Sequence, residues 1–338
     1  MKKIAVSLLA AALTVALAVF SSAKSEAIPG KVSRLDPALD LLVSPTAQIE
    51  TLASGFDWVE GPVWRKSGDY LLFSDIPKNV IFRWKEGEGV SVFLRPAGFT
   101  EAKPLGRELG SNGLTFDSED RLVIADHGNR RVARLNESNF TKTTLADRYK
   151  GKRLNTPNDL TYHSNGDLYF TDPPYGMDGG NKNPAKELSY NGVYRLRPTG
   201  ELTLLTAQLS APNGIALSPD EKTLYVAISD PAHAVWMAYD VEADGTIANE
   251  RVFFDATAMV KAGKKGLPDG MKVDSKGNLF ATGPGGVFIF SPDGRHLGTI
   301  ETGEKTSNCA FGDNGSTLYM TADHALLRIQ LKTKGKGF

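Results

Sequence analysis

The chain has 338 residues, of which 41% are hydrophobic, and its 39 basic residues balance 39 acidic ones. This composition is typical of a globular protein with ample apolar residues for a large core, and it excludes a disordered chain. Without an excess of positive charge, the sequence gives no indication of a nucleic-acid partner or of binding to anionic membranes. The single cysteine, Cys309, excludes an intramolecular disulfide, and the apolar phrase NCAFG around it favours a buried, inert thiol.

Residues 1–27 have the pattern of a secretory signal peptide. Two lysines precede an apolar run from Ile4 to Phe20, and small residues follow, with candidate cleavage points after Ala23 and Ala27. A cleaved signal predicts an exported protein, periplasmic or secreted, without stable membrane association. The alternative is an uncleaved N-terminal anchor, because a run of 17 apolar residues is slightly long for a signal core.

The stretch from Glu60 to Trp84 sets a pattern that occurs six times. An acidic residue is followed by three apolar runs separated by the turn signals KSGD and IPKN, which predicts a three-strand meander. The layout restarts at intervals of 39 to 56 residues, at Asn112, Asn158, Asn213, Asp269 and Asn308. These intervals, together with β-branched and aromatic runs that lack a helical period, indicate the blades of a β-propeller.

The ring closes through an N-terminal strand. Each of the first five repeats is followed by a further β-like segment, which suits the outer strand of a four-stranded blade, whereas the sixth is followed only by a Lys/Gly tail at 333–338. The segment IETLA at residues 49–53 supplies the missing strand, and closure removes the last free sheet edge. We therefore predict an all-β, six-bladed β-propeller over residues 46–332, preceded by a lead-in at 28–45.

Blade topology places a candidate site at one mouth of the channel. Because neighbouring strands are antiparallel, the connection that enters the first strand and the one that leaves the second lie on the same face of the ring. The six opening residues therefore surround one mouth. Polar residues that follow second strands surround it at a greater radius: Asp75, Asp126–His127, Asp172 with Tyr175, Ser229–Asp230 and Asp323–His324.

A single Asn-Gly or Asp-Gly pair before a strand is ordinary turn chemistry. Six openings in register, with Glu60 in the first, favour a shared site instead. Two carboxylates and several amide oxygens that face one point, without His or Cys among them, suit Ca²⁺ and leave coordination positions for water and substrate. The candidate substrate contacts are Asn112, Asn158, Tyr175 and His324.

The phrases EGPVW, PNDLTY, PNGIAL, PDGMKVD and SNCAFG resemble the gluconolactonase, senescence-marker-protein and luciferin-regenerating family of six-bladed, calcium-dependent propellers. The resemblance covers most of residues 46–332, and ADHGNRR and TDPPYG are most similar to its bacterial gluconolactonase branch. It implies metal ligands at four positions, Glu60, Asn158, Asn213 and Asp269, and a sugar lactone as the small-molecule substrate.

The implied chemistry is metal-assisted ester hydrolysis, in which Ca²⁺ polarises the lactone carbonyl. Asp269 is the candidate general base, with Asp172 and His127 as rivals because a metal-bound carboxylate is weakly basic. The alternatives are hydrolysis of other lactones or organophosphate esters on the same scaffold, and a non-catalytic, metal-stabilised binding propeller. The excursion Pro173 to Asn191 leaves a second strand, so it is either a lid over the mouth or a passive surface loop.

Overall fold

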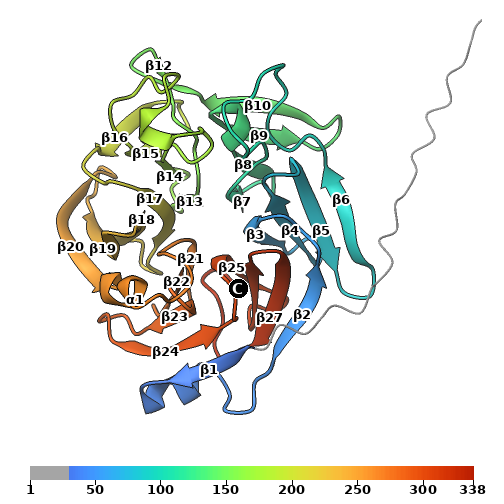
Figure 1. Ribbon diagram of the computed structural model, residues 1–338, viewed down its shortest axis with the longest axis vertical. Helices are drawn as coiled ribbons and strands as arrows, with labels where there is room; N and C mark the ends of the chain where they lie inside the picture. Colours follow the sequence, from blue (N-terminus) through green and yellow to red (C-terminus); the bar gives the residue numbers. More distant parts are fainter. Residues whose placement is uncertain (1–29) are drawn as a thin grey trace, which may run out of the picture.

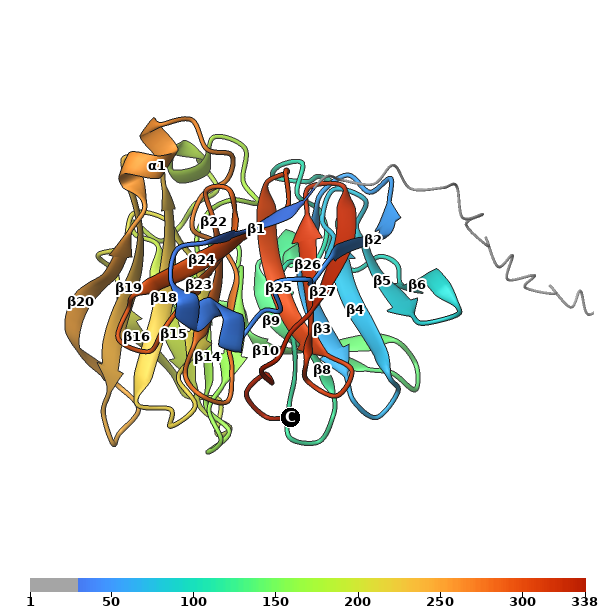
Figure 2. The ribbon, with the colours of Figure 1, turned by 90° about the horizontal axis from the view of Figure 1, so that it is seen from below.

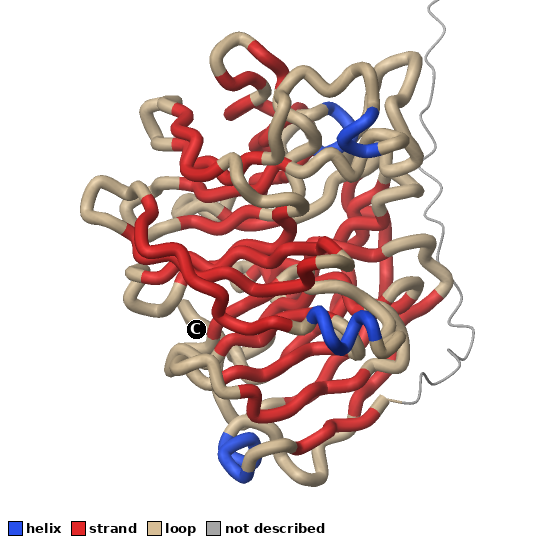
Figure 3. Tube along the Cα trace, turned by 60° about the vertical axis from the view of Figure 1, so that its left-hand side comes forward, coloured by secondary structure: helices blue, strands red, loops and turns tan. Residues whose placement is uncertain are grey.

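The computed structural model describes residues 30–338, so the expected signal peptide at 1–27 and its cleavage points lie outside the described residues. In the described part, six large antiparallel sheets surround a central channel, and the chain visits them in order (Figure 1). Strands make up most of the regular structure, and the few helical turns lie on connections between strands (Figure 3). The predicted all-β, six-bladed propeller is confirmed.

The first three blades follow the first three sequence repeats. Blade 1 consists of β3 (Val59–Arg65), β4 (Tyr70–Asp75), β5 (Val80–Lys85) and β6 (Gly89–Leu94), and blade 2 of β7 (Leu114–Phe116), β8 (Leu122–Asp126), β9 (Arg131–Asn136) and β10 (Thr141–Ala146). A short ribbon, β11 (Arg148–Tyr149) with β12 (Lys152–Arg153), precedes blade 3, which consists of β13 (Leu160–Tyr162), β14 (Leu168–Asp172), β15 (Gly192–Leu196) and β16 (Leu202–Thr206). In each blade the first strand lies at one edge of the sheet and the fourth at the other.

The last three blades repeat this order. Blade 4 consists of β17 (Pro212–Leu217), β18 (Thr223–Asp230), β19 (His233–Val241) and β20 (Ile247–Asp255), and α1 (Thr257–Lys261) follows it. Blade 5 contains β21 (Met271–Val273), β22 (Leu279–Gly283), β23 (Gly286–Phe290) and β24 (His296–Glu301), and blade 6 contains β25 (Thr306–Gly312), β26 (Thr317–Ala322) and β27 (Ala325–Gln330). Short 3₁₀ helices lie at Pro37–Leu41, His127–Asn129 and Gly180–Lys182. Within residues 30–338, none of the helices has the length and apolar composition needed to cross a membrane.

The ring is closed by β2 (Ile49–Ser54), which pairs antiparallel with β27 as the outer strand of blade 6 (Figure 2). Ile49 lies opposite Ile329 and Glu50 opposite Arg328, whose Nε donates to Glu50 Oε2 over 2.8 Å. The predicted closure by IETLA is therefore confirmed. Because blade 6 combines strands from both ends of the chain, the first and last blades are joined and the ring is closed.

Both ends of the described chain are more ordered than the sequence indicates. The lead-in contains β1 (Lys31–Arg34), which adds a fifth strand to blade 5 by pairing with β24. The C-terminal tail crosses the opposite face of the ring from α1 (Figure 2): Gly335 N donates to Gly315 O over 3.0 Å and Lys336 N to Val273 O over 2.9 Å. The tail thus joins blades 5 and 6 across the far mouth of the channel.

The apolar core is divided into wedges between neighbouring blades. Trp64 of blade 1 stacks on Tyr319 of blade 6 with ring centroids 5.4 Å apart, and Trp236 of blade 4 packs on Phe288 and Phe290 of blade 5. Second strands such as β8, β14 and β22 are buried along their whole length because a neighbouring blade covers each face. This explains why their sequences are continuous apolar runs rather than alternating patterns.

Side-chain hydroxyls join neighbouring blades close to the channel. Each donates to a main-chain carbonyl of the next blade: Ser74 to Asn112 O (2.9 Å), Thr171 to Asn213 O (2.6 Å), Thr282 to Ser307 O (2.8 Å) and Ser307 to Val59 O (2.6 Å). Each of the four carbonyls belongs to a predicted opening residue or its immediate neighbour. The ring of hydroxyls therefore fixes the backbone from which the candidate site residues project.

Candidate functional site

Five of the six opening residues line one cavity of about 450 Å³ at the predicted mouth of the channel: Glu60, Asn112, Asn158, Asn213 and Asp269. They lie in β3 and β17 or just before β7, β13 and β21, and therefore come from five different blades. Val260 of α1 also lines the cavity, which places it at the end of the ring opposite the C-terminus (Figure 2). The alignment of the sequence repeats was sufficient to predict that these five residues lie together.

The sixth opening residue, Asn308, does not line the cavity, and in this respect the predicted ring of six is wrong. Its Nδ2 donates to Glu60 Oε2 over 3.2 Å and to Asp159 Oδ2 over 3.5 Å, while its Oδ1 accepts from Cys309 N over 2.9 Å. The amide is thus held with its donor side toward the two carboxylates. Asn308 supports Glu60 from behind rather than presenting an oxygen to the cavity.

The glycines that follow the opening residues are explained by close approach of the blades. A Cβ on Gly214 would lie 2.2 Å from Asp269 O, one on Gly113 2.7 Å from Asn158 O, and one on Gly270 1.9 Å from the Asn308 side chain. None of these three glycines has a positive φ, so a left-handed turn is not the reason for glycine there. Turn chemistry therefore does not account for the Asn-Gly and Asp-Gly pairs, since each glycine makes room for the next blade.

Three buried oxygens at the cavity have no hydrogen-bond partner within the described chain: Asn112 Oδ1, Asn213 Oδ1 and Asp269 Oδ1. The amide nitrogen of Asn213 donates to Ser229 Oγ over 2.9 Å, which leaves its oxygen as the group without a partner. A buried acceptor without a donor costs about 1–3 kcal/mol. Three of them on one cavity, beside Glu60, are a donor set that suits a hard cation.

The site holds few of the residues that bind transition metals. Among residues 30–338, no group of three or more His, Cys, Asp or Glu is arranged to hold a metal ion. A cation here would be bound by the carboxylates of Glu60 and Asp269 together with amide oxygens. Such an all-oxygen set favours Ca²⁺ or Mg²⁺ over Zn²⁺.

Acidic groups are concentrated in and beside the cavity. Burial raises the pKa of Glu60 to about 8; the hydrogen bond from Gly61 N opposes this rise, and the Asp159 carboxylate adds to it. Burial also raises the pKa of Asp269, and the Glu60 and Asp159 carboxylates raise it further. Lys272, whose Nζ lies 3.5 Å from Asn308 Oδ1, is a nearby cation that partly balances Glu60. A bound divalent cation would favour the ionised form of both carboxyl groups.

Asp159 is a residue that the sequence analysis missed. It occupies the position that glycine holds in four of the six repeats, and it is buried beside Glu60 and Asn308. A carboxylate at a position where four repeats have glycine was a signal for it.

Of the predicted site residues that follow second strands, Tyr175 lies at the cavity, whereas His324 and Asp172 do not. Tyr175 lines the cavity, and its hydroxyl donates to Ala211 O over 3.1 Å. His324 does not line it and is about half exposed beside Asp323. Asp172 is fully buried away from the cavity, where its Oδ2 accepts from Asn155 N over 2.8 Å and burial raises its pKa to about 7.

His127 is also fully buried, and it lies behind a cavity residue that the sequence analysis did not single out. Its Nε2 lies 2.9 Å from Glu108 Oε2, and Glu108 itself lines the cavity. Trp58 and Lys305 line it as well; they lie on the connections just before β3 and β25. Of the excursion from Pro173 to Asn191, only Tyr175 reaches the cavity, so the structure gives no lid over the whole mouth.

The fold and site define a six-bladed β-propeller with an oxygen-rich cavity at one mouth of its channel. The family model described as SMP-30/Gluconolactonase/LRE-like region matches residues 58–324. The chain belongs to this family, which confirms the resemblance seen in its motifs.

Individual relatives agree with this membership. The gluconolactonase of Zymomonas mobilis is 44% identical over 317 residues, which cover 90% of this chain and 87% of that protein. A solved structure of a gluconolactonase from Xanthomonas campestris has a TM-score of 0.77 at 32% identity, covering 90% of this chain and 98% of that one. Regucalcin from Agrobacterium tumefaciens, described as a calcium-binding protein, has a TM-score of 0.66 at 20% identity over 86% of this chain and 96% of its own, which shows the shared fold alone.

Proposed function

We propose that this chain hydrolyses a sugar lactone, such as a gluconolactone, with the help of a bound divalent cation, preferably Ca²⁺. The observation that carries the proposal is the cavity of about 450 Å³ on which two carboxylates and three amide side chains from five blades converge. The 44% identity to a gluconolactonase over most of both chains supports the substrate class.

Glu60, Asn158, Asn213 and Asp269 would hold the cation, with Asn112 as a further oxygen or a substrate contact. Two carboxylates and two or three amide oxygens leave positions of a six- to eight-coordinate Ca²⁺ for water and substrate. When bound, the cation supplies Lewis acidity that polarises the lactone carbonyl.

The other cavity residues suit a compact, hydroxylated ring. Trp58, Ile76 and Leu267 provide apolar wall, while Tyr175 and Ser229 place hydroxyls beside it. This combination of an apolar wall with a few fixed polar groups is typical of small-molecule sites and orients the substrate while it displaces water. No other partner is required for this chemistry.

We also propose that the protein is exported to the periplasm or secreted, supported by the signal-like pattern of residues 1–27. The expected mature protein begins after Ala23 or Ala27. Intact mass measurement of the protein purified from its native cell fractions tests this: a full-length mass in the cytosolic fraction contradicts export.

The function is tested by measuring hydrolysis of a panel of aldonolactones by the purified mature protein, with Ca²⁺ and with a chelator. We expect turnover that the chelator abolishes. Asp269→Ala should lose calcium binding and turnover together, whereas Asp147→Ala, which removes an exposed carboxylate, should lose neither. No turnover of any lactone with Ca²⁺ present contradicts the proposal and favours a binding propeller, and chelator-insensitive turnover contradicts the role of the metal.

A further inference from the structure

A third carboxylate lines the cavity apart from the proposed metal ligands. Glu108 belongs to the connection between β6 and β7, and its side chain is 36% exposed. The acidic residues of the cavity lining are Glu60, Asp269 and Glu108, and the first two belong to the proposed ligand set. Glu108 is therefore the acid of the lining that stays available when a cation is bound.

Glu108 is held in place by the imidazole of His127, both of whose ring nitrogens have a partner. His127 is fully buried, with Nδ1 3.2 Å from Pro157 O and Nε2 2.9 Å from Glu108 Oε2. Because Pro157 O only accepts, the contact at Nδ1 is an N–H donated to that carbonyl, and Nε2 is engaged with Glu108 Oε2. Within residues 30–338, no hydrogen bond engages the other carboxylate oxygen, Oε1. The pair therefore fixes one oxygen of Glu108 and leaves the other for a ligand in the cavity.

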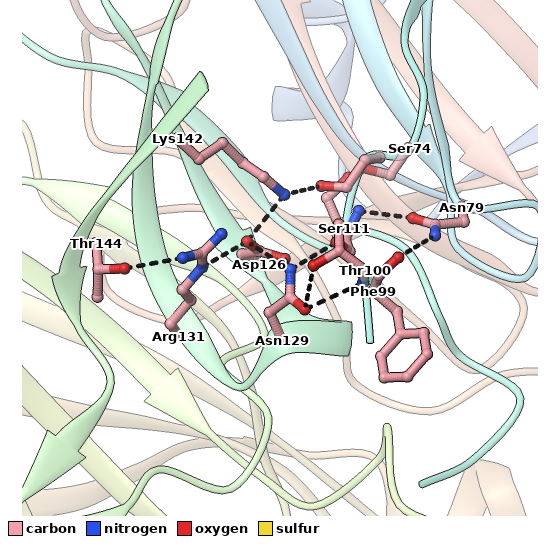
Figure 4. A network of polar contacts seen from close by, with 12 residues as sticks. Ser74, Asn79, Phe99, Thr100, Ser111, Asp126, Asn129, Arg131, Lys142 and Thr144 are labelled. Carbon is pink, nitrogen blue, oxygen red and sulfur yellow. Dashed lines mark hydrogen bonds and ion pairs between the residues drawn. The ribbon is translucent and has the colours of Figure 1, made fainter. Parts of the chain in front are cut away.

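The connection that carries Glu108 is anchored by a buried network (Figure 4). Asp126 accepts from Arg131 Nε over 2.8 Å, forms an ion pair with Lys142 at 2.9 Å, and accepts from Asn129 Nδ2 over 3.1 Å. Asn129 and Lys142 then donate to main-chain carbonyls at the start of the connection, over 2.6 Å and 2.8 Å.

The anchored start is tied directly to the residue after Glu108. Phe99 N donates to Leu109 O over 2.7 Å, and Gly110 N donates to Ile76 O over 2.8 Å. On the other side of Glu108, Leu105 O accepts from Asp178 N over 2.9 Å, so the backbone is held both before and after this residue. A preorganised carboxylate of this kind is what proton transfer at a fixed position requires.

We propose that Glu108 is the general base of the hydrolysis and that His127 is its positioning residue; this rests on the proposed lactonase function. Glu108 Oε1 takes a proton from water as the water oxygen bonds to the lactone carbonyl carbon. When the bond between that carbon and the ring oxygen breaks, the same proton passes to the ring oxygen and the open-chain hydroxy acid forms. This replaces the predicted base Asp269, which belongs to the proposed ligand set. The other two candidates have no free group in the cavity, since Asp172 lies away from it and both nitrogens of His127 are engaged.

The test compares Glu108→Gln with Glu101→Gln, a change of the same kind at an exposed position of the same connection. For Glu108→Gln we expect kcat to fall on the order of 100-fold, KM to stay within about threefold, and calcium affinity by titration calorimetry to be unchanged. Glu101→Gln should match the wild type. His127→Ala should lower kcat on the order of 10-fold, and His127→Gln, which keeps an N–H donor for Glu108, should recover most of that loss.

The outcomes separate this inference from the proposed function. A wild-type protein that hydrolyses no lactone overturns the function, whereas an active wild type with an undiminished Glu108→Gln variant overturns only the base role. A Glu108→Gln variant with raised KM and unchanged kcat also overturns it, because Glu108 would then only bind a substrate hydroxyl. If Glu108→Gln fails to fold by circular dichroism, Glu108→Asp serves instead: a retained carboxylate on a shorter side chain should lower kcat, and wild-type kcat contradicts the proposal.

Discussion

The close approach of blades 4 and 5 predicts the effect of replacing Gly214 by alanine. The added Cβ would lie 2.2 Å from Asp269 O and 2.7 Å from both Asp269 C and Gly270 Cα. These are main-chain atoms of the next blade, so no side chain can rotate out of the way. The two blades must separate by roughly 1 Å to restore an ordinary carbon–oxygen contact.

The expected cost follows from this geometry. Overpacking typically costs about 1–3 kcal/mol, and the contact with fixed backbone places Gly214→Ala at the upper end, about 3 kcal/mol. A domain of about 300 residues has an unfolding entropy of roughly 0.6 kcal/mol per kelvin, so Tm should fall by about 5 °C. Because Asp269 moves with blade 5, calcium affinity should fall on the order of 10-fold, which is about 1.4 kcal/mol.

Scanning calorimetry with EDTA measures the first effect and calcium titration the second. The matched control is Gly200→Ala, where φ is +87° and no heavy atom lies within 4 Å of the added Cβ. Left-handed strain should cost that variant about 1–2 kcal/mol without any change in calcium affinity. If Gly214→Ala keeps both Tm and calcium affinity, close approach does not explain glycine at this position, and the reasoning on all the Asn-Gly and Asp-Gly pairs is refuted.

Three further predictions concern the metal, the buried carboxyl group of Asp172 and ring closure. Calcium at about 100 times its Kd should add about 2.7 kcal/mol to the free energy of unfolding and raise Tm by about 4 °C. Asp269→Asn should abolish this shift in scanning calorimetry. A wild-type protein whose Tm does not change with calcium contradicts the proposed metal site. The raised pKa of Asp172, about 7, means that the native state keeps this proton to higher pH than the unfolded chain does, so the stability contribution is complete below about pH 4 and is lost as pH rises through 7. Urea unfolding should therefore show a fall with pH that Asp172→Asn flattens, and equal slopes for the two proteins contradict it. Deleting residues 30–35 should cost the pairing of β1 and the hydrogen bonds from Arg34 to the carbonyls of Val43 and Ser44. Deleting 30–54 should abolish cooperative thermal unfolding, because it also removes β2 from blade 6.

The sequence predicted the ring because its signal is local and repeated. Each meander has its own turn residues and apolar runs, and the missing outer strand of the sixth repeat pointed to residues 49–53. The strand β1 had no comparable signal: its four residues, KVSR, show no alternation, and their conformation comes from pairing with β24. The tail was equally hidden, since Gly335 fits against Phe311 of blade 6 only after the ring has formed.

The antiparallel order of the strands predicts which face of the ring a residue lies on, but it does not predict the distance of that residue from the channel. It brought Glu60 and its four cavity partners together because first strands lie next to the channel. His324 obeys the same rule, yet it lies outside the cavity, since it follows the left-handed Asp323 in a two-residue turn at the end of β26. Glu108 lies on a connection without a repeat, so only the folded path of residues 95–113 brings it to the cavity.

The glycines that follow the opening residues determine both how closely the blades pack and how closely the acidic residues of the site approach one another. Glycine beside the opening residues lets first strands approach within contact, and this approach brings Glu60, Asp159 and Asp269 into one buried region. The hydrogen bonds from Gly61 and Asn308 and the charge of Lys272 offset only part of the resulting cost at Glu60, whose pKa stays raised. A cation bound at the cavity would relieve the same repulsion, because a ligand that binds only the folded state adds its binding free energy to stability. Calcium affinity and thermal stability should therefore change together in variants of the ring glycines, whereas variants of Glu108 should change turnover without either.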